Sequence, residues 1–544
     1  MNIYKSNKTK LTEKICNDPI YIMTQFYLPN NDERKKEILN CLKLMVHNNL
    51  IDKIYLLNER LYTDDELDIV SDKIKQINIE HRLLYNDCFN FIESASLNGF
   101  IIISNLDIFY DGNLINIKKS NLQNEKKVFC QLRYEYEDTK KLSECKLFTH
   151  NNQKFVRADS QDTWIFHSKY NIKKSYRKIF NFAMGIPGCD NKLVYLWNIL
   201  GYQCHNEPEL IKCYHYHLSN IRTYTNKDII PKPYMGINPI VKDNTNAYFP
   251  HSYNFKNENK TLSNYIQESL ANNKHFIIPR LAGIENNLTH EAVLFVKKEI
   301  TDVNILYSKK RVMKNNAGIY ISNLNSIIQY SQLYLDAFEK CELYCDWSIY
   351  SNVAQYSKRS FPFIYNNFKR KRVDSDTLSI FNNIHIEPWT LQLRGLRILI
   401  ISAFIESIKE KIDDREKIYD IDLFPECSFV YLKPPQTNGS NPSRDFSLEL
   451  KDFCEKIKEI KDEFDIALCS CGGYGNLVCS YIYDLKKSAI YVGGALQMYF
   501  GVYGERWINE NPDIMKLYLN KYWTRPKNNE KPNDYDKIEN SCYW

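Results

Sequence analysis

Strand-like and helix-like patterns alternate along the first part of the chain, and this alternation limits the folds that the chain can adopt. Short apolar runs typical of strands cover residues 21–26, 53–57, 77–84 and 100–104. Helices are predicted between them, over 32–48, 64–75 and 87–98. Strands that alternate with helices in this way predict an α/β fold with a mostly parallel sheet.

The same alternation returns in the second half of the chain. Strands are predicted over 397–403, 429–432, 465–469 and 489–492, and helices over 404–415 and 446–464. The stretch between the halves is rich in proline over 229–250, which is typical of a connection. We therefore predict two Rossmann-like α/β domains, 1–235 and 256–544, joined by a linker over 236–255.

Length and composition favour a globular protein of more than one domain. The 544 residues exceed what a single core usually holds. The net charge of +6 has no dense basic block behind it, which argues against a nucleic-acid partner. No run of 18 apolar residues occurs, so no membrane span is expected. Sixteen scattered cysteines and a polar, Lys-rich beginning predict a reducing, cytoplasmic location.

Acidic and amide side chains follow the strand predicted over 100–104. In "GFIIISNLDIFYDGNL" (99–114), Asn105 and Asp107 come directly after the apolar run. Ligands of open α/β sheets bind beyond the carboxyl ends of the strands. Because a hard divalent cation prefers oxygen ligands and keeps phosphate in its shell, this pair could hold the cation of a bound diphosphate.

The segment "IIISNLDIFYD" resembles the D-x-D motif of GT-A glycosyltransferases, which use nucleotide sugars. Asn105 replaces the first Asp, and Asp107 matches the second, which touches the metal in that family. The resemblance implies a divalent metal, Mn²⁺ or Mg²⁺, and a nucleotide-diphospho-sugar as donor. Gln25, Asn58 and Glu59 are further candidates for binding this donor.

Two later segments resemble other parts of the same family. "FVRADSQDTWIF" (155–166) is similar to the segment with the acceptor-side acid, and we predict Asp162 as the general base with Asp159 in reserve. Helix capping is the alternative for Asp159. "IKCYHYHLSNIRTY" (211–224) places His215 and His217 where the family has a metal-binding His. Between them, "GIPGCDNKLVYLWNILGY" resembles an acceptor-side loop.

The second half resembles the GT-D group of glycosyltransferase-like proteins, known from bacteria and large DNA viruses. The resemblance rests on "FDIALCSCGGYGN" and "GGALQMYFGVYGERW", and it implies roles for Arg280 and Glu285 of "PRLAGIEN" in binding the donor. Gly283 stands where that group has an Asp. Gly472, Gly473 and Gly475 could offer backbone N–H groups to a phosphate, or could form a tight strand-to-helix turn.

These features together predict a metal-dependent glycosyltransferase that moves a sugar to a hydroxyl acceptor in glycan synthesis. The protein could be bifunctional and could form a homo-oligomer. A non-catalytic carbohydrate-binding or scaffolding protein is the alternative, favoured by the missing Asp in both motifs. A nucleotidyltransferase is a third possibility, but the first 30 residues have no Gly-rich loop with a Lys.

Overall fold

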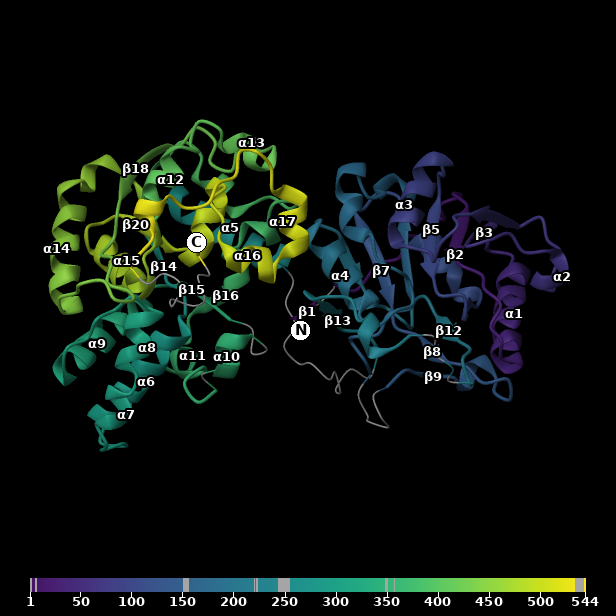
Figure 1. Cartoon of the computed structure of the whole chain (residues 1–544), viewed down its shortest axis with the longest axis horizontal. Helices are drawn as coiled ribbons and strands as arrows, with labels where there is room; N and C mark the ends of the chain where they lie inside the picture. The colour runs from purple at the N-terminus through teal and green to yellow at the C-terminus, as the bar shows by residue number, and fades with distance from the viewer. Residues whose placement is uncertain are drawn as a thin grey trace. The chain divides into compact units, whose positions relative to one another are not determined.

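The computed structural model describes residues 2–4, 7–149, 156–219, 221, 224–242, 255–347, 351–356, 358–533 and 543–544. The chain divides into two compact units, Met1–Asn254 and Phe255–Trp544. Unit 1 runs from purple to teal and unit 2 from teal to yellow in Figure 1. Each unit has its own sheet and its own hydrophobic cluster, and the two are described separately.

Unit 1 is built on a seven-stranded sheet in the order β11-β7-β10-β5-β2-β3-β4. Its strands are β2 (Ile20–Thr24), β3 (Lys53–Asn58), β4 (Ile74–Asn78), β5 (Phe100–Ser104), β7 (Lys127–Gln131), β10 (Thr163–His167) and β11 (Gln203–His205). Strand β10 runs antiparallel to both β5 and β7, and the other pairs are parallel. The prediction of an α/β architecture is confirmed. The order reverses between β2 and β5, which is where ligands bind in sheets of this kind.

Different elements cover the two faces of this sheet. On one face, α1 (Asp32–His47) shares a hydrophobic cluster with a small second sheet. That sheet has the order β6 (Ile108–Tyr110), β12 (Cys213–His215), β8 (Tyr134–Glu135) and β9 (Lys146–Leu147). On the other face, α3 (Tyr85–Ser94) and α4 (Cys189–Ile199) pack aromatic side chains against β10.

Unit 1 also contains residues from the stretch predicted to be a linker. Strand β13 (Met235–Ile237) pairs in parallel with β1 (Asn2–Tyr4). The N–H of Ile237 donates to the carbonyl oxygen of Ala158, and the N–H of Ile240 donates to that of Asn206. A boundary placed after residue 235 would cut through these bonds.

The helix predicted over 64–75 is wrong. The structure has a single turn, α2 (Asp64–Leu67), followed by the edge strand β4. Thr63 and Glu66 form a capping box at its start, and Asp68 has a left-handed backbone (φ 52°) that ends the helix. The strand predicted over 77–84 accordingly begins earlier, since Ile74–Asn78 pairs with β3.

Unit 2 is built on a five-stranded, fully parallel sheet in the order β14-β20-β19-β17-β18. Its strands are β14 (Ile277–Ile278), β17 (Arg397–Ser402), β18 (Ser428–Leu432), β19 (Ile466–Ser470) and β20 (Ser488–Tyr491). The chain passes from β17 to β18 and then returns to the other side of β17, so the order reverses between β17 and β19. A short parallel pair is formed by β15 (Leu343–Asp346) and β16 (Lys371–Asp374).

Helices α6, α9, α14 and α15 share a hydrophobic cluster with the sheet. The helices of the unit are α5 (Phe255–Ala271), α6 (Gly283–Val296), α7 (Asn304–Tyr307), α8 (Lys310–Asn315), α9 (Leu324–Lys340), α10 (Asn352–Tyr356), α11 (Phe363–Phe368), α12 (Ile405–Lys409), α13 (Arg415–Tyr419), α14 (Phe446–Glu459), α15 (Gly475–Asp484), α16 (Glu505–Glu510) and α17 (Pro512–Tyr518). The helix predicted over 404–415 is thus divided. Among the described residues, no helix combines the length and the apolar character that crossing a bilayer requires.

Candidate functional site

A cavity of about 330 Å³ lies at the carboxyl ends of the strands in unit 1. It is lined by residues that follow β2, β3, β4 and β5, at the point where the strand order reverses. Most residues predicted for the N-terminal site line it, namely Gln25, Glu59, Asn105, Asp107, Asp162, His215 and His217. The lining also includes three arginines, Arg34, Arg82 and Arg133.

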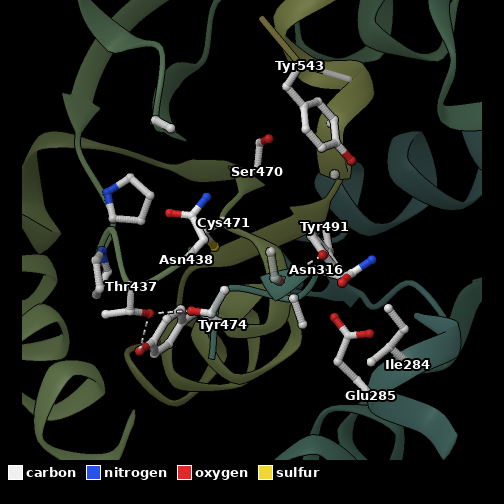
Figure 2. A pocket seen from close by; sticks show the side chains of 18 of the residues that line it. Ile284, Glu285, Asn316, Thr437, Asn438, Ser470, Cys471, Tyr474, Tyr491 and Tyr543 are labelled. Carbon is white, nitrogen blue, oxygen red and sulfur yellow. Dashed lines mark hydrogen bonds between the residues drawn. The ribbon is translucent and has the colours of Figure 1, made fainter. Parts of the chain in front are cut away.

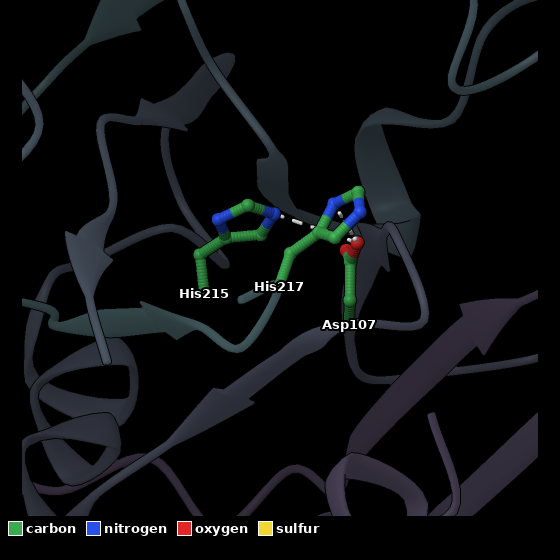
Figure 3. Close-up of side chains that lie close together, drawn as sticks. All are labelled: Asp107, His215 and His217. Atoms are coloured by element: carbon green, nitrogen blue, oxygen red, sulfur yellow. Dashed lines mark ion pairs between the residues drawn. The ribbon is translucent and has the colours of Figure 1, made fainter. Parts of the chain in front are cut away.

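Asp107, His215 and His217 form a group that could hold a metal ion. One ligand atom of each lies within 4.8 Å of the others, and Figure 3 shows the three side chains together. Asp107 precedes β6, while His215 ends β12, and these strands pair with His215 opposite Ile108. Two nitrogen donors and one carboxylate suit a divalent transition metal.

Both histidines have their second ring nitrogen engaged, which leaves one nitrogen of each for the cation. Nδ1 of His215 lies 3.2 Å from Oε2 of Glu135, and Nε2 lies 3.4 Å from Oδ2 of Asp107. Nε2 of His217 lies 3.0 Å from the carbonyl oxygen of Ile221, and Nδ1 lies 3.7 Å from Oδ2 of Asp107. Metal-binding histidines commonly donate their other N–H to a carboxylate or a carbonyl, as here.

One carboxylate oxygen of Asp107 is free to bind a cation. Oδ1 of Asp107 is buried and has no hydrogen-bond partner, which costs free energy unless a cation or donor satisfies it. Burial by itself raises the pKa of Asp107, but His215 and Arg34 hold that pKa well below its usual range. Burial and the Arg34 guanidinium lower the pKa of His217 to about 4, so this imidazole is neutral near pH 7. The residues present fit a metal.

Arg34 on α1 forms ion pairs that hold Asp107 in place. It donates to Oδ2 of Asp107 at 2.5 Å and to Oε2 of Glu37 at 3.0 Å, and all three side chains are buried. Glu37 in turn accepts from the N–H (2.7 Å) and the hydroxyl (2.9 Å) of Ser219, two residues after His217. One helix therefore positions both chain segments that carry the candidate ligands.

We expect Arg34→Met to lower the free energy of unfolding by about 3–5 kcal/mol, because it leaves the buried carboxylates of Asp107 and Glu37 unpaired. Mn²⁺ should restore part of this loss by supplying a positive charge beside Asp107. Thermal unfolding with and without Mn²⁺ measures both effects. Lys43→Met on the same helix is the control, since its ion pair with Asp68 is exposed and worth about 1 kcal/mol or less. Equal losses of unfolding free energy in the two variants would contradict the role of Arg34 in holding Asp107.

Asp162 lines the cavity but is strongly paired. Its Oδ2 accepts from NH1 of Arg133 at 2.5 Å, and its Oδ1 accepts from Nδ2 of Asn105 at 3.1 Å. Arg133 also donates to Oε1 of Glu135 at 2.7 Å. Both carboxylate oxygens of Asp162 are therefore already engaged by side chains of the protein.

Asp190, in the first turn of α4, is a second carboxylate near this part of the site, although it is not among the residues that line the cavity. Its Oδ2 accepts from the N–H of Gln161 at 3.3 Å, which places it beside Asp162. Burial and, to a lesser extent, the nearby Asp162 raise the pKa of Asp190 to about 7. Cys189-Asp190 belongs to the segment that resembles an acceptor-side loop, but its pattern predicts no role for Asp190. Its place directly after the Gly-rich turn "GIPG" was the available signal.

Two predicted residues lie away from the cavity. Asn58 is fully buried, accepts from the N–H of Phe26 at 2.8 Å and donates to Gln76, so it ties the end of β3 to β4 and to the segment after β2. Asp159 pairs with Arg157 at 2.9 Å and does not line the cavity. Gln25 does line it, while its amide also bonds the carbonyl of His81 and the N–H of Leu83.

A second cavity, of about 470 Å³, lies at the carboxyl ends of the strands in unit 2. Arg280, Glu285 and Gly472 line it, as Figure 2 shows for Glu285. Other lining residues follow β17, β18, β19 and β20, so this cavity too lies where the strand order reverses. Among the described residues of unit 2, no group of three His, Cys, Asp or Glu is close enough to hold a metal.

Gly473 and Gly475 do not line this cavity. The N–H of Gly473 donates to the carbonyl oxygen of Ala317 at 2.7 Å, and that of Gly475 donates to Gly472. A Cβ at Gly475 would meet the ring of Tyr491 at 2.3 Å. Both N–H groups are therefore used inside the fold, which corrects the expectation that they would bind phosphate and favours the tight-turn alternative.

No family model matches the chain, and no curated protein matches it. Among solved structures, it is similar to GalNAc-T7 with UDP, GalNAc and Mn²⁺ (10% identity, TM-score 0.27, 40% of this chain and 46% of that chain). It is similar to a glycosyltransferase (DUF1792) from Streptococcus sanguinis (12%, 0.26, 51% and 96%). It is also similar to 4-diphosphocytidyl-2C-methyl-D-erythritol synthase from Anaerococcus prevotii (14%, 0.24, 39% and 94%).

These neighbours include glycosyltransferases. The chain spans less than half the length of GalNAc-T7. At these identities and TM-scores the likeness identifies neither a substrate nor a reaction.

Proposed function

We propose that the protein is a glycosyltransferase whose donor, a nucleotide-diphospho-sugar, binds in the cavity of unit 1. The observation that carries the proposal is the convergence of Asp107, His215 and His217 at the carboxyl edge of the sheet, with one ring nitrogen of each histidine left available. A divalent metal bound there would neutralise the diphosphate as it leaves.

The chain's own residues have distinct roles in this proposal. Asp107, His215 and His217 hold the cation, and Arg34 orients Asp107. Asn105 lies beside the cation site and faces the donor. Arg82 supplies further positive charge near the phosphates, since its guanidinium donates to the carbonyl oxygens of Met184 and Gly185 and not to a carboxylate.

We assign the proton transfer to Asp190 rather than to Asp162. The acceptor hydroxyl must lose a proton, and a base with a pKa near the working pH does this best. Asp162 keeps its ion pair with Arg133 and its hydrogen bond from the amide of Asn105.

The test is a release assay with the full chain and a panel of UDP-, GDP- and CDP-sugars, with Mn²⁺ or with EDTA. We expect release of nucleoside diphosphate from one donor class, and loss of that release in EDTA. No turnover together with retained saccharide binding would favour the carbohydrate-binding alternative. Formation of a nucleotide sugar from a nucleoside triphosphate and a sugar phosphate would favour a nucleotidyltransferase.

A further inference from the structure

The cavity of unit 2 carries little charge for a site that would bind a nucleotide sugar. Arg280 and Glu285 are the charged side chains among its described lining residues, and their charges are opposite. A diphosphate brings two negative charges, which proteins usually meet with a divalent cation or several cationic groups. The described residues here offer neither a metal-binding group nor a second arginine.

The single arginine packs against the wall of the cavity, and its buried Nε has no hydrogen-bond partner within the protein. The guanidinium of Arg280 stacks over the ring of Trp347, with Cζ 4.6 Å from the ring centroid. A Cβ on Gly493 would lie 2.0 Å from NH1 of Arg280, so the arginine packs directly on the turn after β20. These contacts hold Arg280 against the cavity wall.

The rest of the lining combines aromatic rings with amides. Tyr474, Tyr491, Tyr543 and Trp544 supply the rings, and Asn316, Gln436 and Asn438 supply the amides. Figure 2 shows Asn438, Tyr491 and Tyr543 around the same hollow. Aromatic faces cover the apolar C–H face of a sugar ring, and an amide both donates to and accepts from hydroxyl groups.

Asn438 has an unused hydrogen-bond acceptor for such a ligand. Its Oδ1 is buried and has no hydrogen-bond partner within the protein. A buried carbonyl oxygen without a partner costs free energy, and a hydroxyl of a bound molecule would remove that cost. The volume of about 470 Å³ lies in the range of about 300–1,000 Å³ typical of small-ligand sites.

We infer that the cavity of unit 2 binds an uncharged saccharide without a metal. The ligand class is a neutral glycan with free hydroxyl groups. The inference goes beyond the proposed function, because it assigns a separate ligand to a separate cavity. If unit 1 transfers sugars, this saccharide is suited to be the glycan that is extended, but binding does not require the transfer.

The test uses the full chain in EDTA with three neutral disaccharides, cellobiose, lactose and maltose, and with UDP-glucose for contrast. Saturation-transfer NMR and calorimetry measure binding. We expect at least one disaccharide to bind in EDTA, and Asn438→Ala to weaken that binding by at least about fivefold. Asn529→Ala, at an exposed position, is the matched control and should bind as the wild type does.

Asp107→Asn separates this inference from the proposed function. It should remove Mn²⁺-dependent nucleotide binding in unit 1 and leave disaccharide binding unchanged. The inference is overturned if no disaccharide binds at millimolar concentration, or if binding survives Asn438→Ala unchanged. It is also overturned if UDP-glucose displaces the disaccharide in EDTA. Thermal unfolding of Asn438→Ala, compared with the wild type, checks that a loss of binding does not reflect a loss of fold.

Discussion

Replacing Asp107 by asparagine should weaken Mn²⁺-dependent binding of UDP by at least about 100-fold. The substitution keeps the size of the side chain but removes the negative charge that the cation site requires. It also leaves the buried guanidinium of Arg34 facing an amide, so some loss of stability is expected as well. Calorimetry with UDP, in Mn²⁺ and in EDTA, measures the effect directly.

Asp111→Asn is a matched control in the same "LDIFYD" segment. Asp111 accepts from the N–H of Asn113 and from the hydroxyl of Tyr214, and it does not line the cavity. We expect this variant to bind UDP as the wild type does. If Asp107→Asn binds UDP in Mn²⁺ with unchanged affinity, the assignment of the metal to this group is wrong, whatever its stability.

Replacing Asp190 by asparagine should lower kcat for nucleoside-diphosphate release by about 10²–10⁴-fold while donor binding is retained, because a positioned base contributes that much. The pH dependence gives a second readout. In the wild type the base works only when ionised, so with a pKa of about 7 the rate should rise with pH and level off above that value.

Stability should follow the opposite trend. The pKa of Asp190 in the folded protein lies above its ordinary value of 3.8, so the folded state binds more protons than the unfolded state between these values. The wild type therefore loses stability as pH rises from about 3.8 to about 7, and this loss is complete above that value. Asp190→Asn does not ionise, so its melting temperature should rise relative to that of the wild type across this range and keep a constant difference above pH 7.

Asp162→Asn is the competing variant. It removes the partner of Arg133, so we expect a loss of stability. Because the charge of Asp162 helps to raise the pKa of Asp190, the rise of the rate with pH should remain in this variant but move to lower pH. If Asp162→Asn abolishes turnover while Asp190→Asn stays nearly as active as the wild type, Asp162 is the base and our reassignment fails.

Local patterns were enough for much of the architecture. The strand over 100–104 stands as predicted, because a run buried on both faces leaves little ambiguity. The 64–75 segment shows the limit of such patterns. A capping box and apolar spacing favour a helix there, but Asp68 ends it, and pairing with β3 draws Ile74–Asn78 into the sheet.

Some residues of the candidate site could likewise be predicted from the sequence, and others could not. Asp107, His215 and His217 could be proposed from the sequence because their side chains are themselves ligand types. Arg34 and Glu135 could not, since they act through contacts with residues 73 and 80 positions away. Asn58 looks like a strand-end ligand in the sequence, and only its bond to the N–H of Phe26 shows that it serves the fold.

The pairing of β6 with β12 has a consequence for how this protein can vary. Successive side chains of a strand point to opposite faces, and here His215 faces Asp107 while Tyr214 packs into the core. An insertion of a single residue ahead of His215 that shifted β12 by one position would put tyrosines where the histidines stand. Insertions of any length between β9 and β10 would leave that alignment intact. Related chains can therefore differ greatly in the length of that connection and still keep Asp107, His215 and His217 together. A shift of one residue in the three-residue strand β12 would separate these side chains.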